Sequence, residues 1–145
     1  MTTHDDIAVV RRFFDDVCNG RQLDLVDDLL TPDHVYHDPQ IPDVVGPQAM
    51  AQALSVYQTG LDGHWQVDDL HAAEGHRVVA RWTGTGTHQA DVNGIPPTGK
   101  PVRVAAVHLF RLAGDKIAEQ WCVWDTLGML QQLGVVPTPE QAPPA

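Results

Sequence analysis

The segment Lys116 to Asp125, KIAEQWCVWD, ends in the side chain best suited to proton transfer. Alternation predicts a strand with Trp121 and Asp125 on one face and Cys122 and Trp124 on the other. A carboxylate that closes so apolar a strand faces either a pocket, where it could act as a general base, or solvent, where it would cap the next helix. The pattern alone leaves both interpretations open, because the helical segment TLGMLQQLG begins at the next residue.

Two histidines could donate hydrogen bonds to the oxygen charge that develops when a base removes a proton from carbon. His108 interrupts the aliphatic strand VRVAAVHLF, and His37 lies in the segment YHDP, where Asp38 could orient its ring. Each also has a purely structural interpretation, His108 as a hydrogen-bonded core residue and His37 as a turn residue. His34 and His37 are three apart, which places them on opposite faces of an extended segment, so we expect no metal site.

The elements that must position these side chains divide into a helical first half and a second half that forms a sheet. A capping box of Thr3 and Asp6 starts the first predicted helix. Apolar residues at helical spacing then define the helices. The predicted segments are helices at 3–19, 22–30 and 47–59, with a short strand at 35–38 and a proline-bearing loop to Gly46 before the third helix.

Alternating polar and apolar residues replace the helical pattern after Gly60. A bulge near Asp68-Asp69 would keep the apolar residues on both sides of it on one face, and would bend the sheet. A tight turn at 113–115 makes the last two strands antiparallel neighbours. The predicted strands are one from about residue 65, then 77–87, 102–112 and 116–125.

These elements predict one α+β domain over residues 1–137, cone-shaped and open at one end. Three N-terminal helices would pack on a strongly curved, mainly antiparallel sheet, and a short C-terminal helix would follow Asp125. The tail at 138–145 is proline-rich and is predicted to be disordered.

Composition excludes several classes of partner. Nineteen Asp plus Glu against nine Lys plus Arg give a net charge of -10, and the pI is about 4.9, which disfavours nucleic acid and anionic membranes. No stretch approaches the roughly 18 apolar residues of a membrane span, and no signal peptide is recognisable, so we expect a cytoplasmic protein. Cys18 and Cys122 have no metal or redox spacing, which favours two buried reduced thiols and leaves a disulfide between them open.

Three segments resemble the SnoaL-like polyketide cyclase family of the nuclear-transport-factor-two-like superfamily. They are VDDLLTPDHVYHDP, RWTGTGTHQADVNGIPPTGKPV and FRLAGDKIAEQWCVWDTLGMLQQLG, within a match over roughly residues 7–137. The most telling part is the pattern E-x-W-x-x-x-D, formed by Glu119, Trp121 and Asp125. The resemblance implies a cone around a deep, largely apolar pocket, and association through the outer face of the sheet.

Characterised members of that family close a ring of an aromatic polyketide ester by intramolecular aldol condensation, without metal or cofactor, with an acidic residue as base. By its position in the motif, Asp125 would be that base, and His108 and His37 would be its catalytic partners. The implied substrate is a small apolar or aromatic carbonyl compound. The residues expected to bind this substrate are Phe14, Tyr36, Leu54, Tyr57, Trp82, His88 and Trp121.

Two other functions are compatible with the same fold. One is a non-catalytic domain that holds an apolar ligand, in which Asp125 is a helix cap. The other is an epoxide hydrolase or isomerase. A hydrolase needs a second carboxylate and an arginine around a water molecule, and the strand before Asp125 has no Arg-x-Asp pattern, although Arg81 and Arg103 are available.

The strand 116–125 is too apolar on both faces to lie in water on either side. With so few helices to cover the sheet, the side that carries Cys122 and Trp124 is expected to contact another subunit. We therefore predict a homodimer or homotetramer.

Overall fold

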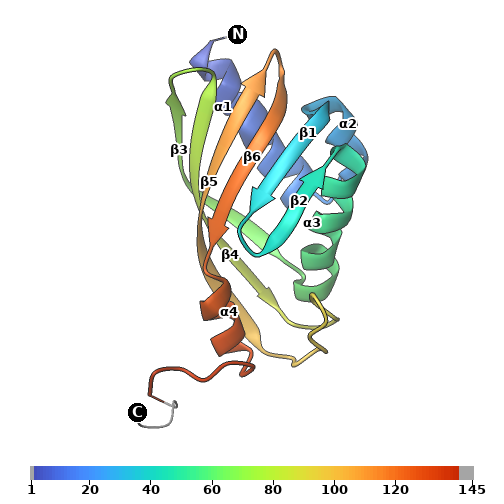
Figure 1. The fold of residues 1–145 in the computed structure, drawn as a ribbon, viewed down its shortest axis with the longest axis vertical. Coiled ribbons are helices and arrows are strands. Elements are labelled where there is room, and N and C mark those ends of the chain that lie inside the picture. Colours follow the sequence, from blue (N-terminus) through green and yellow to red (C-terminus); the bar gives the residue numbers. More distant parts are fainter. Residues whose placement is uncertain (1, 141–145) are drawn as a thin grey trace.

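The computed structural model describes residues 2–140 and has an α+β architecture. One long, curved sheet carries helices against one of its faces, and a short helix lies at its lower end (Figure 1). The helices are α1 (Thr3–Arg12), which continues as a π-helical segment (Phe13–Asn19), a 3₁₀ turn (Leu23–Leu25), α2 (Val26–Leu29), α3 (Pro47–Leu61) and α4 (Thr126–Gln132). The strands are β1 (Leu30–Asp38), β2 (Ile41–Val45), β3 (His64–Ala73), β4 (Arg77–Thr87), β5 (Pro101–Ala113) and β6 (Lys116–Trp124).

The sheet has the strand order β2-β1-β6-β5-β4-β3. Its neighbours pair antiparallel except β1 and β6, which run parallel with Tyr36 opposite Gln120. The expected α+β class and mainly antiparallel sheet are confirmed. The parallel pair has a consequence for the site, because it brings the C-terminal ends of β1 and β6 to the same end of the sheet.

Several local predictions in the second half of the chain are confirmed. The pairing of β3 with β4 shifts its register between Val67 and Asp69, where the bulge was expected. The strand predicted at 77–87 is β4, and the turn after β5 leads into an antiparallel β6. Gly86 is required where β4 passes the end of α3, because a Cβ atom there would collide with the carbonyl oxygen of Leu61.

The first half departs from the prediction around β1. This strand is longer than the predicted 35–38 because it pairs with β6 on one side and β2 on the other. The predicted proline-bearing loop contains β2, an edge strand that tolerates Pro42 because it has no outer neighbour. The second predicted helix is reduced to one 3₁₀ turn and the single turn of α2.

The capping box of α1 lies one residue earlier than predicted. Thr2 and Asp5 form it, and the Asp5 amide donates to the Thr2 hydroxyl over 3.2 Å. Asp6 is instead fully buried, and its carboxylate lies 3.1 Å from His76 Nδ1 in the turn between β3 and β4. The helix start is thereby joined to the sheet.

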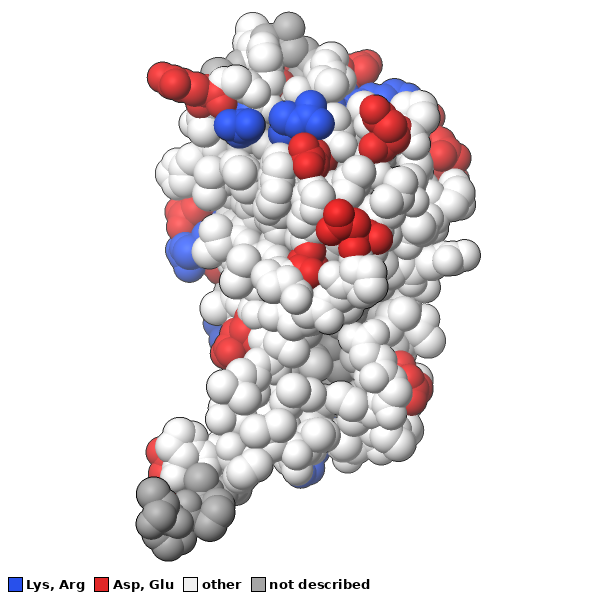
Figure 2. All heavy atoms as spheres, viewed as in Figure 1, with Lys and Arg blue, Asp and Glu red and all other residues white. Residues whose placement is uncertain are grey.

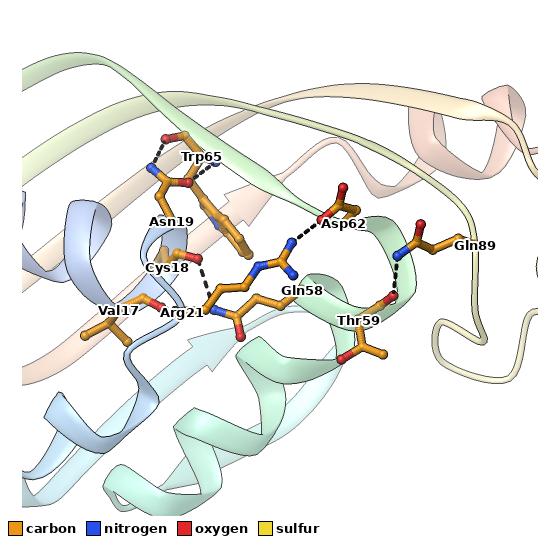
Figure 3. A network of polar contacts seen from close by, with 9 residues as sticks. All are labelled: Val17, Cys18, Asn19, Arg21, Gln58, Thr59, Asp62, Trp65 and Gln89. Carbon is orange, nitrogen blue, oxygen red and sulfur yellow. Dashed lines mark hydrogen bonds and ion pairs between the residues drawn. The ribbon is translucent and has the colours of Figure 1, made fainter.

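The side chain of Gln58 on α3 and the backbone of Trp65 on β3 bond the end of the π-helical segment (Figure 3). Gln58 Nε2 donates to the carbonyl oxygens of Val17, at 2.9 Å, and Cys18, at 3.0 Å. The Asn19 amide exchanges two hydrogen bonds of 2.7 Å with the backbone of Trp65. These contacts hold the helical layer against the sheet, and both Gln58 and the carbonyl oxygens it serves lie in the core.

Two further expectations concern the whole chain. Within residues 2–140, no helix is long and apolar enough to cross a membrane. The tail at 138–145 was predicted to be disordered. Residues 141–145 lie outside the described part of the chain, so the disorder stays a prediction.

We expect Gln58→Leu to lower the free energy of unfolding by about 1–3 kcal/mol, because two buried carbonyl oxygens lose their donor while the side-chain volume is nearly kept. Urea unfolding measures this change. The control is Gln52→Leu on the exposed face of the same helix, which should stay within about 0.5 kcal/mol of the parent. Equal stability of the Gln58 and Gln52 variants would contradict this account of the helix end.

Candidate functional site

A deep cavity lies between the inner face of the sheet, α3 and the start of α4. Its empty space, counted out through the open mouth, is about 860 Å³. Figure 2 shows a hollow in the surface just below the β1–β2 turn, surrounded by largely uncharged atoms. The walls are apolar and aromatic, so an uncharged, flat ligand suits them.

Five of the seven residues expected to bind substrate line this cavity. Phe14 and Trp82 form part of the inner wall, with ring centroids 6.4 Å apart. Tyr57 lies edge-on to Trp124 at 5.9 Å. The five lining residues are Phe14, Tyr36, Leu54, Tyr57 and Trp82. Their placement agrees with a role in substrate binding, which stays a prediction.

His108 also lines the cavity and belongs to a buried chain of hydrogen bonds. The indole Nε1–H of Trp82 donates to His108 Nδ1 at 3.3 Å. His108 Nε2 lies 2.6 Å from Gln120 Oε1, and Gln120 Nε2 lies 3.0 Å from His34 Nε2. Because an indole can only donate, His108 Nδ1 accepts, and the proton of a neutral His108 is on Nε2. His108 Nε2 then donates to Gln120 Oε1, and Gln120 Nε2 donates to His34 Nε2.

Burial keeps both histidines of this chain neutral. It lowers the pKa of His108 to about 4 and the pKa of His34 also to about 4. The ring of His108 stacks on Phe110 with centroids 4.2 Å apart. Its one lone pair is occupied by Trp82, so His108 is poorly placed to be a base. The structural interpretation of His108 therefore has direct support, and the catalytic interpretation stays a prediction.

Asp38, at the end of β1, places a carboxylate on the cavity wall and is only 7% exposed. Its Oδ2 accepts hydrogen bonds from Tyr36 Oη at 3.2 Å and from Trp124 Nε1 at 3.0 Å. Its Oδ1 accepts one from the Gln40 backbone amide at 3.0 Å. All three donors are neutral, so the carboxylate is held in place without an ion pair.

Two thiols complete the polar part of the cavity. Cys18 and Cys122 both line it as free, buried cysteines, in agreement with the expectation of reduced thiols. Burial raises the pKa of Cys122 to about 12, and its sulfur lies within hydrogen-bonding reach of Tyr36. Burial likewise raises the pKa of Tyr36. Both groups therefore carry their protons at neutral pH.

The predicted orientation of β6 is wrong. The cavity contacts the even-numbered side chains Cys122 and Trp124, whereas Glu119 and Trp121 lie on the outer face of the sheet. Both faces of this strand are apolar, so alternation could divide the residues into two sets without deciding which set points inward. The surface that was expected to meet another subunit is thus the cavity wall.

Asp125 and Trp121 consequently lie outside the cavity lining. Asp125 is exposed and is the N-cap of α4, where its Oδ1 accepts a hydrogen bond from the Gly128 amide at 2.9 Å. This is the structural alternative left open by the sequence. The structure does not bring Asp125 to this cavity, and its role as a base stays a prediction.

His37 is also on the outer face, opposite His34 on β1. Its ring stacks on Trp121 at 5.4 Å, and its nitrogens lie 2.6 Å from Glu119 and 3.0 Å from Asp43. The hydrogen bond with Glu119 raises the pKa of His37. This arrangement makes His37 a hydrogen-bonded link between β1, β2 and β6, and does not bring it to the cavity.

His88 lies beyond the cavity, at the end of β4. It is fully buried, and its Nδ1 accepts from the Thr98 amide at 3.2 Å, which holds the long loop before β5. Of the three predicted catalytic residues, only His108 reaches the cavity, and the structure does not bring Asp125 or His37 to it. The separation of His34 and His37 onto opposite faces is as expected, and within residues 2–140 no three His, Cys, Asp or Glu side chains form a metal-binding group.

Sequence reasoning assigned no cavity role to Asp38, Cys122 or Trp124. Asp38 was considered only as a partner of His37. Alternation along YHD does place Tyr36 and Asp38 on one face, so a recognised β1–β6 pairing would have indicated a carboxylate beside the tyrosine. That pairing joins segments 86 positions apart and has no local signal.

Comparisons with known proteins agree on the fold and the family. The model of the SnoaL-like polyketide cyclase family matches residues 8–133. The chain is similar to the aklanonic acid methyl ester cyclase DnrD of Streptomyces peucetius, with 29% identity over 92% of this chain and 94% of the relative. The cyclase DauD of Streptomyces sp. strain C5, for the same ester, is also 29% identical, over 92% of this chain and 85% of that protein. The structure of TsrD from Streptomyces laurentii superposes with a TM-score of 0.82 at 23% identity, covering 94% of this chain and 99% of that one.

We expect the fold to lose stability as the pH falls from about 6.5 to about 4. Over this range the unfolded chain protonates His34 and His108, whereas the folded chain does not, so each can contribute a loss on the order of 3 kcal/mol. The raised pKa of His37 does not offset this loss, because its contribution is fully present below about pH 6.5 and is lost only as the pH rises above that value. Thermal melts across this range measure the loss.

The same melts on two variants identify the source of the slope. His34→Gln should flatten it, and the control His71→Gln, at a largely exposed position, should leave it unchanged. A parent protein whose melting temperature is constant between these pH values would contradict the neutral hydrogen-bond chain.

Proposed function

We propose that this chain, which belongs to the SnoaL-like polyketide cyclase family, is an acid/base enzyme that acts on an apolar aromatic carbonyl compound without a cofactor. The observation that carries the proposal is the apolar cavity whose wall holds a carboxylate, a phenol and a thiol, from Asp38, Tyr36 and Cys122. The curated relatives DnrD and DauD are cyclases of aklanonic acid methyl ester, so the substrate class we propose is an aromatic polyketide ester.

The proposed reaction is an intramolecular aldol closure. A base removes a proton from a carbon next to carbonyl groups, the enolate carbon attacks a second carbonyl, and the resulting alkoxide takes up a proton. The flat walls would hold the rings, and a cavity with little water would strengthen hydrogen bonds to the developing oxygen charge. Cys122 keeps its proton at neutral pH and can donate to that oxygen.

The cavity offers less to the alternative functions. Hydrolysis of an epoxide calls for two carboxylates and an arginine around one water molecule, whereas the described cavity wall contains Asp38 as its one carboxylate and no arginine. A protein that only binds an apolar ligand has no use for a buried carboxylate held by three neutral donors. The acid/base function therefore accounts for more of the lining.

We also propose that two chains associate through the outer face of the sheet. Two cross-strand pairs, Val107 with Val123 and Leu109 with Trp121, form an apolar surface there. Val107 is 53% exposed and Val123 is 62% exposed. Such a patch on adjacent strands favours burial against a second copy.

Conversion of aklanonic acid methyl ester tests the proposed activity. The purified protein, without added metal or cofactor, should give a product of unchanged mass and altered chromatographic retention, because an aldol closure forms one C–C bond and moves one proton within the same molecule. Filling the cavity with Leu54→Trp should lower kcat/KM roughly tenfold or more. The control is Leu127→Trp on the exposed side of α4. A parent protein that binds the ester and converts none of it would favour the non-catalytic alternative.

Light scattering at micromolar concentration tests the association. We expect a particle of about twice the 15.9 kDa chain mass, or a multiple of it. Val123→Glu should shift it toward the monomer, because a charge would be buried in the contact, while Val135→Glu, exposed but outside the sheet, should not. A monomeric parent would refute the proposed contact.

A further inference from the structure

We propose that Asp38 is the catalytic base of this cavity, the carboxylate that takes the proton from substrate carbon and returns it to the product oxygen. The assignment rests on the proposed function and adds the identity of the base. Its first support is position, since Asp38 is the one carboxylic acid on the described cavity wall, whereas Asp125 and Glu119 lie outside that wall.

The hydrogen bonds of Asp38 leave one oxygen with spare capacity. A carboxylate oxygen has roughly two lone pairs. Those of Oδ2 are used by Tyr36 and Trp124, whereas Oδ1 accepts only the Gln40 amide. Oδ1 is therefore the atom that can accept a proton while the carboxylate stays fixed by its other contacts.

No cation neutralises this carboxylate within residues 2–140. None of the ion pairs there includes Asp38, in contrast to Glu119, which pairs with Arg111 at 3.2 Å and with His37 at 2.6 Å. A carboxylate paired with a guanidinium gives up its partner when it is protonated, and Asp38 has no such loss. Neutral donors thus orient Asp38 and leave its charge available for a substrate proton.

The other polar groups on the wall are unsuitable as bases. The lone pair of His108 is engaged by Trp82, and burial lowers the pKa of its ring to about 4. Burial raises the pKa of Cys122 to about 12, so its thiol is a donor. Asp38 is the group that remains when position, free lone pairs and protonation are considered together.

The proposed steps balance without another reactant. The C–H bond next to the carbonyl breaks, its proton forms an O–H bond on Asp38 Oδ1, and its electron pair moves to the enolate oxygen. The enolate carbon then forms a C–C bond with the second carbonyl carbon. The π electron pair of that second carbonyl moves onto its oxygen, which becomes an alkoxide. This alkoxide takes the proton from Asp38, and the carboxylate is restored.

Deuterium exchange into 2-tetralone isolates the first step. This aromatic ketone has an acidic C–H bond but no second carbonyl, so it can lose a proton and cannot close a ring. In D₂O the parent protein should catalyse exchange, followed by NMR, and Asp38→Asn should slow it at least about 100-fold. Quenching of tryptophan fluorescence should show that the variant still binds 2-tetralone within about threefold of the parent.

Two control substitutions separate this assignment from the alternatives. Asp43→Asn changes an exposed acid on the neighbouring strand β2, and Asp125→Asn changes the α4 cap, so both should exchange at the parent rate. Equal exchange by the parent and Asp38→Asn would overturn the role of Asp38, as would a loss confined to Asp125→Asn. A parent that binds 2-tetralone and exchanges nothing would instead overturn the proposed function itself.

Chemical rescue decides the matter if Asp38→Asn fails to fold. Asp38→Ala leaves space on the cavity wall for a small carboxylate, and added formate should restore exchange in proportion to its concentration. Circular dichroism verifies that this variant is folded. A folded Asp38→Ala that formate does not activate would overturn the assignment.

Discussion

A chain of hydrogen bonds between buried polar side chains on the inner face of the sheet is the constraint on which the cavity depends. Trp82, His108, Gln120 and His34 come from β4, β5, β6 and β1, so one hydrogen-bond chain crosses four adjacent strands. Each link matches one donor to one acceptor, and two histidines must stay neutral for it to persist. A shift of any strand by one residue would turn its member outward and leave a buried partner unsatisfied. The hydrogen-bond chain thus specifies the strand register in addition to the buried apolar face.

The parallel pairing of β1 and β6 explains where the polar groups of the cavity gather. Parallel strands end at the same edge of a sheet, so Asp38 and Trp124 meet there although the sequence separates them widely. Tyr36 and Cys122 precede them on the same inner face. The polar groups therefore lie together at the C-terminal ends of β1 and β6, while the aliphatic and aromatic walls extend along the antiparallel strands.

The strands of the second half could be predicted from the sequence because their alternation is long and their turns carry glycine. The bulge at Asp68-Asp69 was predictable for the same reason. β2 was not, because its five residues are mostly exposed and include Pro42, so they have no apolar alternation. The orientation of β6 was beyond a local pattern, since each of its faces carries a tryptophan. Because of that ambiguity, the sequence pointed to Asp125 as the base, and the structure shows Asp125 as a helix cap outside the cavity.

The position of β6 also orders the events of biosynthesis. This last strand inserts between β1 and β5, and β1 has no other link to the main sheet. A ribosome that has released residues up to Ala113 has therefore delivered two separate sheet fragments, the β1–β2 hairpin and the β3–β4–β5 meander, each with an unpaired edge. Until Trp124 emerges, the nascent chain must keep these edges from pairing with other chains. The cavity is accordingly among the last features that this protein acquires.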